Sequence, residues 1–169
     1  MTFGFLIRAC KGAVRSDVAV IFSGQFKYTV DSKGRINIPA PFRSQLPDKS
    51  AEDEGGTDGI FFHVTFGVDP CLYAFPRSVF KEEVSKLEEE CGSFFAPKDK
   101  IKLFRRIMSN AQPCRSDQQG RIIIPKEHLE YAQIQEEVLI IGLGSRIELW
   151  NPELFKESID GDPEPSESE

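Results

Sequence analysis

The sequence predicts an α+β domain in which two copies of one strand, turn and strand unit pack about a pseudo-two-fold axis, with helices outside. Residues 28–39 recur at 114–125 with a single offset of 86 positions and no gap. Apolar and polar residues alternate around each turn, which is typical of half-buried strands, and longer stretches elsewhere have helical spacing. One copy alone would bury too little apolar surface to be stable, so we expect the two copies to share a core.

The first copy begins with a half-buried strand that ends in a tight turn. Apolar and polar side chains alternate through residues 25–30. Asp31 then opens the turn, where an aspartate can accept hydrogen bonds from backbone N–H groups that follow it. Gly34 closes the turn, because glycine accepts the positive φ that other residues resist. The same two residue types stand at 117 and 120 in the second copy.

A second strand follows the turn, and its alternation decides where Arg35 points. Ile36 and Ile38 share one face of this strand, and Arg35 lies on the other face. The apolar face must be buried, so we expect Arg35 to point outward. Pro39 cannot continue a strand ladder and leads into a short helical pattern at 40–46.

The remaining elements correspond between the two copies. Strands are expected at 60–64 and 72–75, and their counterparts at 138–142 and 147–150. Short helices are expected at 40–46 and 126–132, longer ones at 76–91 and 98–110, and a last helix from residue 151 onward.

These elements divide the chain into five segments. Residues 1–20 have no counterpart in the second copy, and we expect them to be either an added leader or the product of a start codon assigned upstream in error. The first copy contains an acidic insertion at 48–59, because the offset between the copies falls by eleven residues across it. The predicted organisation is a flexible extension at 1–20, a first repeat at 21–91, a connecting helix at 92–110, a second repeat at 111–159 and a disordered acidic tail at 160–169.

The charge distribution bears on a nucleic-acid partner. The net charge is −6, which is unfavourable for binding a polyanion, because phosphate neutralisation provides most of such affinity. Residues 48–59 carry −4 and residues 152–169 carry −6, so the rest of the chain carries +4. Charge alone favours a mildly acidic protein whose charges are simply solvated.

Two short motifs carry a family resemblance. They are Asp31-Ser-Lys-Gly-Arg35 and Asp117-Gln-Gln-Gly-Arg121, with further matches at 71–76, 104–106 and 142–150. In these motifs the chain resembles the MraZ family of bacterial transcriptional regulators, built from two AbrB-like swapped-hairpin units, and the resemblance extends from about residue 22 to 155. One Asp-x-x-x-Arg would be a weak signal, but two copies in register within the same frame are specific.

The resemblance implies both a fold and a function. The fold is α+β, with two AbrB-like swapped-hairpin repeats forming one double-psi β-barrel-like core surrounded by helices. The implied function is sequence-specific binding of double-stranded promoter DNA at short direct repeats, by a ring-like homo-oligomer that regulates the cell-division and cell-wall gene cluster. The implied location is cytoplasmic and associated with the nucleoid.

Arg35 and Arg121 are the first candidates for DNA contact. A guanidinium can form two parallel hydrogen bonds with guanine or with phosphate, a geometry that lysine cannot copy. Asp31 and Asp117 are expected to orient the two arginines; alternatively, each pair only staples its own turn. Lys33 adds a charge to the first turn, so the first copy is expected to contribute more than the second.

Other charged and polar residues are weaker candidates. Arg43 in the short helix and Lys27 on the preceding strand could contact phosphate, but a solvated surface charge is the preferred interpretation of each. Arg105 and Arg106 are interpreted as surface or intersubunit residues. His128 takes the place of a phenylalanine in the first copy, which favours a structural role.

Catalytic and metal-binding motifs are not found in the sequence. The four cysteines, at 10, 71, 91 and 114, form no C-x-x-C pair, and only His63 and His128 could assist them. The chain has no glycine-rich phosphate loop and no apolar run of about 20 residues that could span a membrane. We therefore expect no enzymatic activity, cofactor, metal, small-molecule substrate or membrane.

The sequence is also compatible with one other function. The same fold could serve as an antitoxin-like or scaffold module that binds a protein partner. Such an antitoxin would normally have one repeat and a tail with apolar anchors, and the tail of this chain has none.

Overall fold

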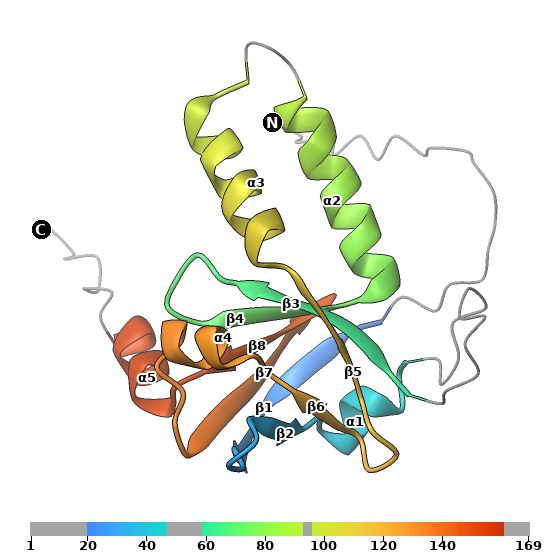
Figure 1. Cartoon of the computed structure of the whole chain (residues 1–169), viewed down its shortest axis with the longest axis vertical. Coiled ribbons are helices and arrows are strands. Elements are labelled where there is room, and N and C mark those ends of the chain that lie inside the picture. Colours follow the sequence, from blue (N-terminus) through green and yellow to red (C-terminus); the bar gives the residue numbers. More distant parts are fainter. Residues whose placement is uncertain (1–19, 47–58, 93–95, 161–169) are drawn as a thin grey trace, which may run out of the picture.

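Eight strands in two antiparallel sheets occupy the centre of the described chain, and five helices surround them (Figure 1). The computed structural model describes residues 20–46, 59–92 and 96–160. The α+β class expected from the sequence is confirmed. The expected extension, acidic insertion and acidic tail lie outside the described residues, apart from their boundary positions 20, 59 and 160.

The elements follow the expected order closely. They are β1 (Phe22–Thr29), β2 (Arg35–Asn37), α1 (Ala40–Arg43), β3 (Phe61–Phe66), β4 (Leu72–Pro76), α2 (Arg77–Cys91), α3 (Lys98–Asn110), β5 (Gln112–Arg115), β6 (Arg121–Ile123), α4 (Lys126–Tyr131), β7 (Glu137–Gly144), β8 (Arg146–Trp150) and α5 (Pro152–Asp160).

The larger sheet interleaves the two copies of the repeat. Its strand order is β1-β7-β8-β4-β3-β5. Strand β1 of the first copy pairs with β7 of the second, and β5 of the second copy pairs with β3 of the first. Strands β4 and β8 meet in the middle of the sheet. Each copy therefore completes its sheet only with a strand of the other.

Strands β2 and β6 form a separate two-stranded sheet, here called the ribbon. The register pairs Ile36 with Ile122 at its centre, flanked by Arg35 with Ile123 and Asn37 with Arg121. The ribbon lies at the end of the molecule opposite the helices α2 and α3 (Figure 1). It too contains one strand from each copy.

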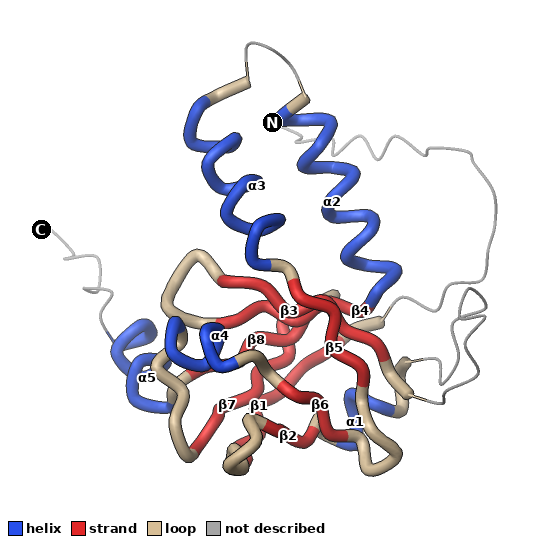
Figure 2. The backbone as a smooth tube through the Cα atoms, viewed as in Figure 1, coloured by secondary structure: helices blue, strands red, loops and turns tan. Residues whose placement is uncertain are grey.

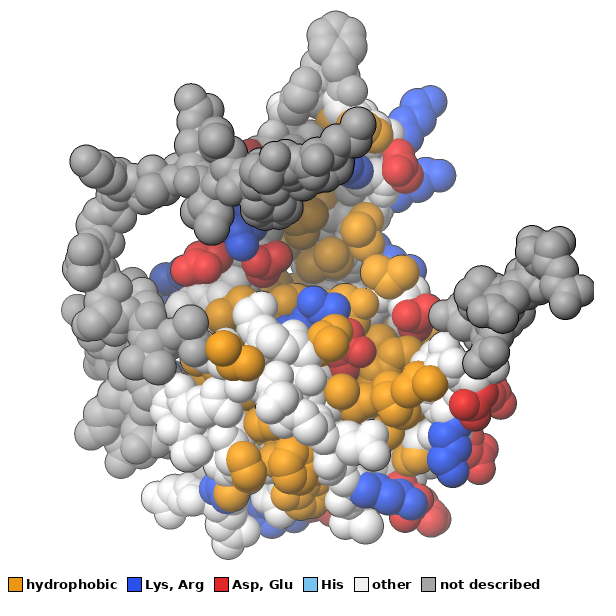
Figure 3. Space-filling view, turned by 180° about the vertical axis from the view of Figure 1, so that it is seen from behind, with side chains coloured by type: hydrophobic (Ala, Val, Ile, Leu, Met, Phe, Trp, Pro, Cys, Tyr) orange, Lys and Arg blue, Asp and Glu red, His pale blue; other side chains and the backbone are white. Residues whose placement is uncertain are grey.

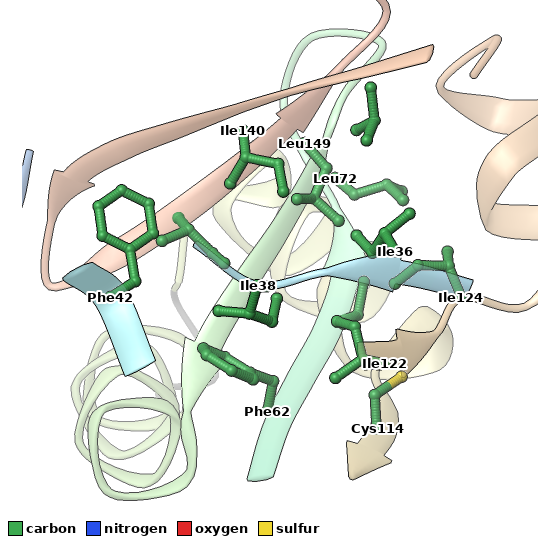
Figure 4. Packing of buried hydrophobic residues seen from close by; sticks show 14 of the residues in the cluster. Ile36, Ile38, Phe42, Phe62, Leu72, Cys114, Ile122, Ile124, Ile140 and Leu149 are labelled. Atoms are coloured by element: carbon green, nitrogen blue, oxygen red, sulfur yellow. The ribbon is translucent and has the colours of Figure 1, made fainter. Parts of the chain in front are cut away.

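The ribbon contributes its inner face to the hydrophobic core (Figure 4). Ile36 and Ile122 are fully buried, and so are Ile38 and Ile124 just beyond the strands. They pack in one cluster with residues of the large sheet, such as Leu149. The burial follows the alternation in the sequence, so the outward direction expected for Arg35 agrees with the fold.

The short helices α1 and α4 each follow a proline that fixes the entry angle. Pro39 and Pro125 have φ near −51° and −57° and stand just before the first helical residue. Phe42 in α1 is fully buried, and His128 occupies the corresponding place in α4. The Nε2 atom of His128 lies 2.7 Å from the carbonyl oxygen of Asn110, which supports the structural role expected for this histidine.

Helices α2 and α3 form a hairpin that projects from the sheet (Figure 1). Its base is fixed by Thr65, which donates a 2.8 Å hydrogen bond to the carbonyl of Ile107, and by His63, which stacks on Phe80 with ring centroids 4.2 Å apart. Beyond this base, none of the described α3 residues is fully buried, although the sequence gives this helix a broad apolar face. The apolar face is thus only partly covered within one chain.

The two arginines expected at the surface of α3 differ. Arg105 is exposed, as expected. Arg106 instead donates a hydrogen bond to the hydroxyl of Tyr131, and its guanidinium lies 5.2 Å from the centre of that ring. Arg106 therefore links α3 to α4 within the chain. No described helix is long and apolar enough to cross a membrane.

The adjacent isoleucines of β6 test the assignment of the two ribbon faces. Ile122 is fully buried, whereas Ile123 is 58% exposed. Replacing Ile122 with Ala should lower the free energy of unfolding by about 2–5 kcal/mol, because a cavity remains in the core. Ile123→Ala, the matched control, should change it by at most about 0.5 kcal/mol. Urea unfolding followed by circular dichroism measures both, and equal losses would contradict the assignment.

Candidate nucleic-acid interface

The first turn is held together by the carboxylate of Asp31. Its Oδ1 atom accepts hydrogen bonds from the backbone N–H groups of Lys33 and Arg35, both at 2.9 Å. Its Oδ2 atom accepts a hydrogen bond from Nε of Arg35 at 2.5 Å. Gly34 has a φ of +72° and donates to the carbonyl of Asp31 at 2.9 Å. The local sequence thus specifies both the turn and the direction of the arginine.

The second turn repeats this arrangement atom for atom. Oδ1 of Asp117 accepts from the backbone N–H groups of Gln119 and Arg121, each at 2.9 Å. Oδ2 accepts from Nε of Arg121 at 2.8 Å. Gly120 has a φ of +77°. The duplicated motif therefore produces two equivalent structural units.

The hydrogen bonds also keep both carboxylates charged. The backbone N–H of Arg35, together with its guanidinium and the N–H of Lys33, lowers the pKa of Asp31 to about 2. The backbone N–H of Arg121 is the main cause of a lowered pKa at Asp117. A charged carboxylate binds the guanidinium more strongly than a neutral one.

The Asp–Arg pairs expected as turn staples are therefore present, and they leave the guanidinium groups partly accessible. Each arginine side chain is 30% exposed. The bond through Nε uses one of the five N–H donors of an arginine. Stapling the turn and contacting a ligand are thus compatible roles for the same side chain.

The outer face of the ribbon brings the two arginines together. Alternation places Arg35, Asn37, Arg121 and Ile123 on this face, opposite the buried isoleucines. Arg35 and Arg121 are diagonal neighbours across the ribbon, a relation that places such residues about 7–8 Å apart. Ile123 was not among the residues expected at a site, although its outward position follows from the same alternation.

Each turn is fixed in place by the other copy. The backbone N–H of Ile38 donates to the carbonyl of Gly120 at 3.0 Å, and that of Ile124 donates to the carbonyl of Gly34 at 2.9 Å. The two turns therefore lie at opposite ends of the ribbon, as the loops in Figure 2 show. Their relative position is a property of the fold rather than of either loop.

The remaining expected residues have different surroundings. Lys33 is exposed on the first turn. Arg43 lies against the second turn, with Nη1 3.5 Å from the carbonyl oxygen of Gln119, so it is not simply a solvated charge. Lys27 of β1 pairs with Glu137 of β7 at 2.6 Å. The structure therefore gathers every expected residue except Lys27 around the ribbon.

The described residues contain no cluster of three or more histidine, cysteine, aspartate or glutamate side chains that could hold a metal ion. Burial raises the pKa of the Cys71 thiol to about 12 and that of Cys114 to about 11. These two thiols are therefore protonated at neutral pH and poor nucleophiles.

Comparisons with known proteins agree with the duplicated motif. Residues 21–104 and 107–168 match the model of the family described as "MraZ protein, putative antitoxin-like". The chain is 44% identical over 132 residues to "Transcriptional regulator MraZ" of Halothermothrix orenii, covering 78% of this chain and 81% of that protein. Proteins of the same name from Carboxydothermus hydrogenoformans and Pediococcus pentosaceus are 35% and 36% identical, each over 83% of this chain and over 88% and 87% of their own lengths.

The pKa of Asp31 predicts a pH dependence of stability. Because this pKa is lowered from 3.8 to about 2 on folding, the carboxylate stabilises the protein above pH 4, and its contribution is lost between pH 4 and pH 2. Asp31→Asn should lower the melting temperature at pH 7, and the difference from the parent should shrink steadily below pH 4. Thermal melts from pH 7 to pH 2 measure this.

The matched control is Glu89→Gln, which changes an exposed carboxylate on α2. This control should melt like the parent throughout the range. A constant difference between Asp31→Asn and the parent from pH 7 to pH 2 would contradict the turn-capping role of the carboxylate.

Proposed function

The chain belongs to the MraZ family, and we propose that it regulates transcription by binding double-stranded DNA with the outer face of the ribbon formed by β2 and β6. The single observation that carries this proposal is the pair of Asp–Arg turns with the same hydrogen bonds at the two ends of that ribbon. The relatives described above are named transcriptional regulators, which supports the proposed process.

The shape of the ribbon suits the major groove of DNA. A two-stranded β-ribbon fits this groove, which is about 12 Å wide. Each ribbon strand has three residues, a length of about 10 Å. Such an element can place Arg35 and Arg121 against base edges in the groove while the adjoining turns approach the phosphates.

The aspartates favour specific contact by fixing the arginines in advance. A free arginine side chain loses about 2 kcal/mol of rotamer entropy when it is fixed. Asp31 and Asp117 already hold the guanidinium groups through Nε, so part of this loss occurs on folding rather than on binding. The remaining N–H donors can then form paired hydrogen bonds with guanine.

One chain presents few cations to DNA, so several chains are needed for strong binding. We therefore propose a ring-like homo-oligomer that engages short direct promoter repeats, upstream of the cell-division and cell-wall gene cluster and in association with the nucleoid. Linked binding units gain affinity through their effective concentration at successive sites. The partly covered apolar residues of α3, such as Phe104, Ile107 and Met108, suit the contact between subunits. Hydrophobic side chains also gather near this hairpin on the face of the molecule seen in Figure 3.

The finer fold belongs to the same proposal. We interpret residues 21–91 and 111–159 as two AbrB-like swapped-hairpin repeats, joined by the segment 92–110, that share a double-psi β-barrel-like core. The reciprocal pairing of β1 with β7 and of β5 with β3 supports this interpretation. A DNA-binding unit of this kind requires both repeats in one folded body.

An antitoxin-like module that binds a protein partner is the second candidate. The words "antitoxin-like" in the description of the matched family favour this candidate. It gives no reason for two accessible arginines to be fixed on one face, so the DNA proposal explains more of the structure. Binding of the purified chain to a promoter fragment distinguishes the two.

Replacing Arg35 with Ala should abolish specific binding to a DNA fragment from the region upstream of the chain's own gene. The melting temperature should stay close to that of the parent, because the backbone hydrogen bonds to Asp31 remain. Fluorescence anisotropy at several salt concentrations, with a scrambled fragment as competitor, measures the specific part. Lys156→Ala, which removes an exposed charge on α5, should bind like the parent. Equal affinities of Arg35→Ala and the parent would contradict the proposed site.

Replacing Met108 with Lys should reduce the subunit number, because the charge falls in the partly covered apolar face of α3. Met108 is 40% exposed, so the fold should tolerate the change. Light scattering after size-exclusion chromatography measures the mass, and Glu89→Lys on α2 serves as the control. A monomeric parent would contradict the oligomer, and an unchanged mass of Met108→Lys would contradict the hairpin as the contact.

A further inference from the structure

The two turns differ in charge, although their geometry is the same. In the first turn Asp31 is followed by both Lys33 and Arg35, whereas in the second Asp117 is followed by Arg121 alone. Gln119 stands at the position that corresponds to Lys33. Counted over these residues, the first turn has a net positive charge and the second turn is neutral.

We infer that Arg43, which belongs to the first repeat, supplies the missing cation to the second turn. This inference rests on the proposed function, and it makes the DNA-contacting tip of the second turn a structure of both repeats. With this inference, each turn has one cation beyond its Asp–Arg pair. We therefore no longer expect the first copy to contribute more to DNA binding than the second.

The contact between Arg43 and the second turn is close. A Cβ atom added to Gly120 would lie 2.6 Å from Cδ and 2.8 Å from Cζ of Arg43, so the arginine packs directly on the glycine. Nη1 lies 3.5 Å from the carbonyl oxygen of Gln119. The guanidinium therefore lies beside the backbone of Gln119, the residue that corresponds in sequence to Lys33 of the first turn.

The corresponding contact at the first turn shows that a turn glycine can be covered by an uncharged side chain. Leu129 of α4 is the counterpart of Arg43 and covers Gly34 of the first turn, where an added Cβ would lie 3.3 Å from a methyl carbon of Leu129. A leucine is thus sufficient to cover a turn glycine. The arginine stands at the turn that lacks a lysine, and the leucine at the turn that has one.

The charge of Arg43 is not neutralised within the described part of the chain. No described carboxylate pairs with it, whereas Arg35 and Arg121 each pair with an aspartate. Its Nε atom is buried and has no hydrogen-bond partner among the described residues. Among the described residues, the guanidinium's only hydrogen bond is the long one from Nη1 to the carbonyl of Gln119, so its other Nη donors remain for a phosphate.

The test replaces Arg43 with Leu, the residue that covers the first turn. Packing on Gly120 should be retained, so the melting temperature should stay near that of the parent. Affinity for the promoter fragment should fall by at least about tenfold, because the variant has no charge to place against the phosphate. The plot of log affinity against log salt should become shallower by about 0.9 for each phosphate that the variant leaves without a cation.

A second substitution separates charge from packing. Gln119→Lys, added to Arg43→Leu, gives the second turn the lysine of the first and should restore both the affinity and the salt slope. Lys156→Leu, which removes an exposed charge on α5, is the matched control and should leave both unchanged. If Arg43→Leu lowers the melting temperature, Arg43→Lys should keep the salt slope of the parent.

Two results would overturn the inference while leaving the proposed function intact. One is an Arg43→Leu variant with the affinity and salt slope of the parent. The other is a weakened variant that Gln119→Lys does not restore. The proposed function itself fails separately, if the parent protein does not bind the promoter fragment or if Arg35→Ala binds equally well.

Discussion

The pairing of β2 with β6 is the interaction on which the rest of the structure depends. These strands have three residues each, and an isolated ribbon of this size would not be stable in water. It persists because Ile36 and Ile122 are buried in the common core and because each turn carbonyl accepts a hydrogen bond from the other copy. The arginines are thus positioned by the entire core rather than by their loops.

The dependence of each repeat on strands of the other connects the duplication of the sequence with the proposed DNA binding. Either repeat alone would lack the partner strand of its ribbon and a neighbouring strand in the large sheet. The same exchange places Arg43 on the second turn and Leu129 on the first. Equivalent positions in the two copies can therefore diverge in charge, because each one completes the turn of the other copy.

The sequence predicted the local parts of the site well. Alternation and the Asp-x-x-Gly-Arg pattern are enough to predict the turns, the buried isoleucines and the direction of Arg35, because all of these depend on neighbours within a few residues. The contact of Arg43 with Gly120 joins residues 77 positions apart, so no local pattern could predict it. The limited burial of α3 has a similar cause, because apolar spacing predicts an apolar face but not how much of the chain covers it.

An aspartate beside each arginine looks unfavourable on a surface that approaches phosphates. In these turns, however, the carboxylate oxygens already accept hydrogen bonds from two backbone N–H groups and from Nε of the arginine. The same bonds lower the pKa of Asp31 to about 2, which reflects how strongly its charge is compensated locally. The turn therefore keeps the orienting effect of the aspartate. Because the aspartate offsets the charge of its arginine, the net positive charge of each turn must come from a further residue. That residue is Lys33 at the first turn and, by our inference, Arg43 at the second.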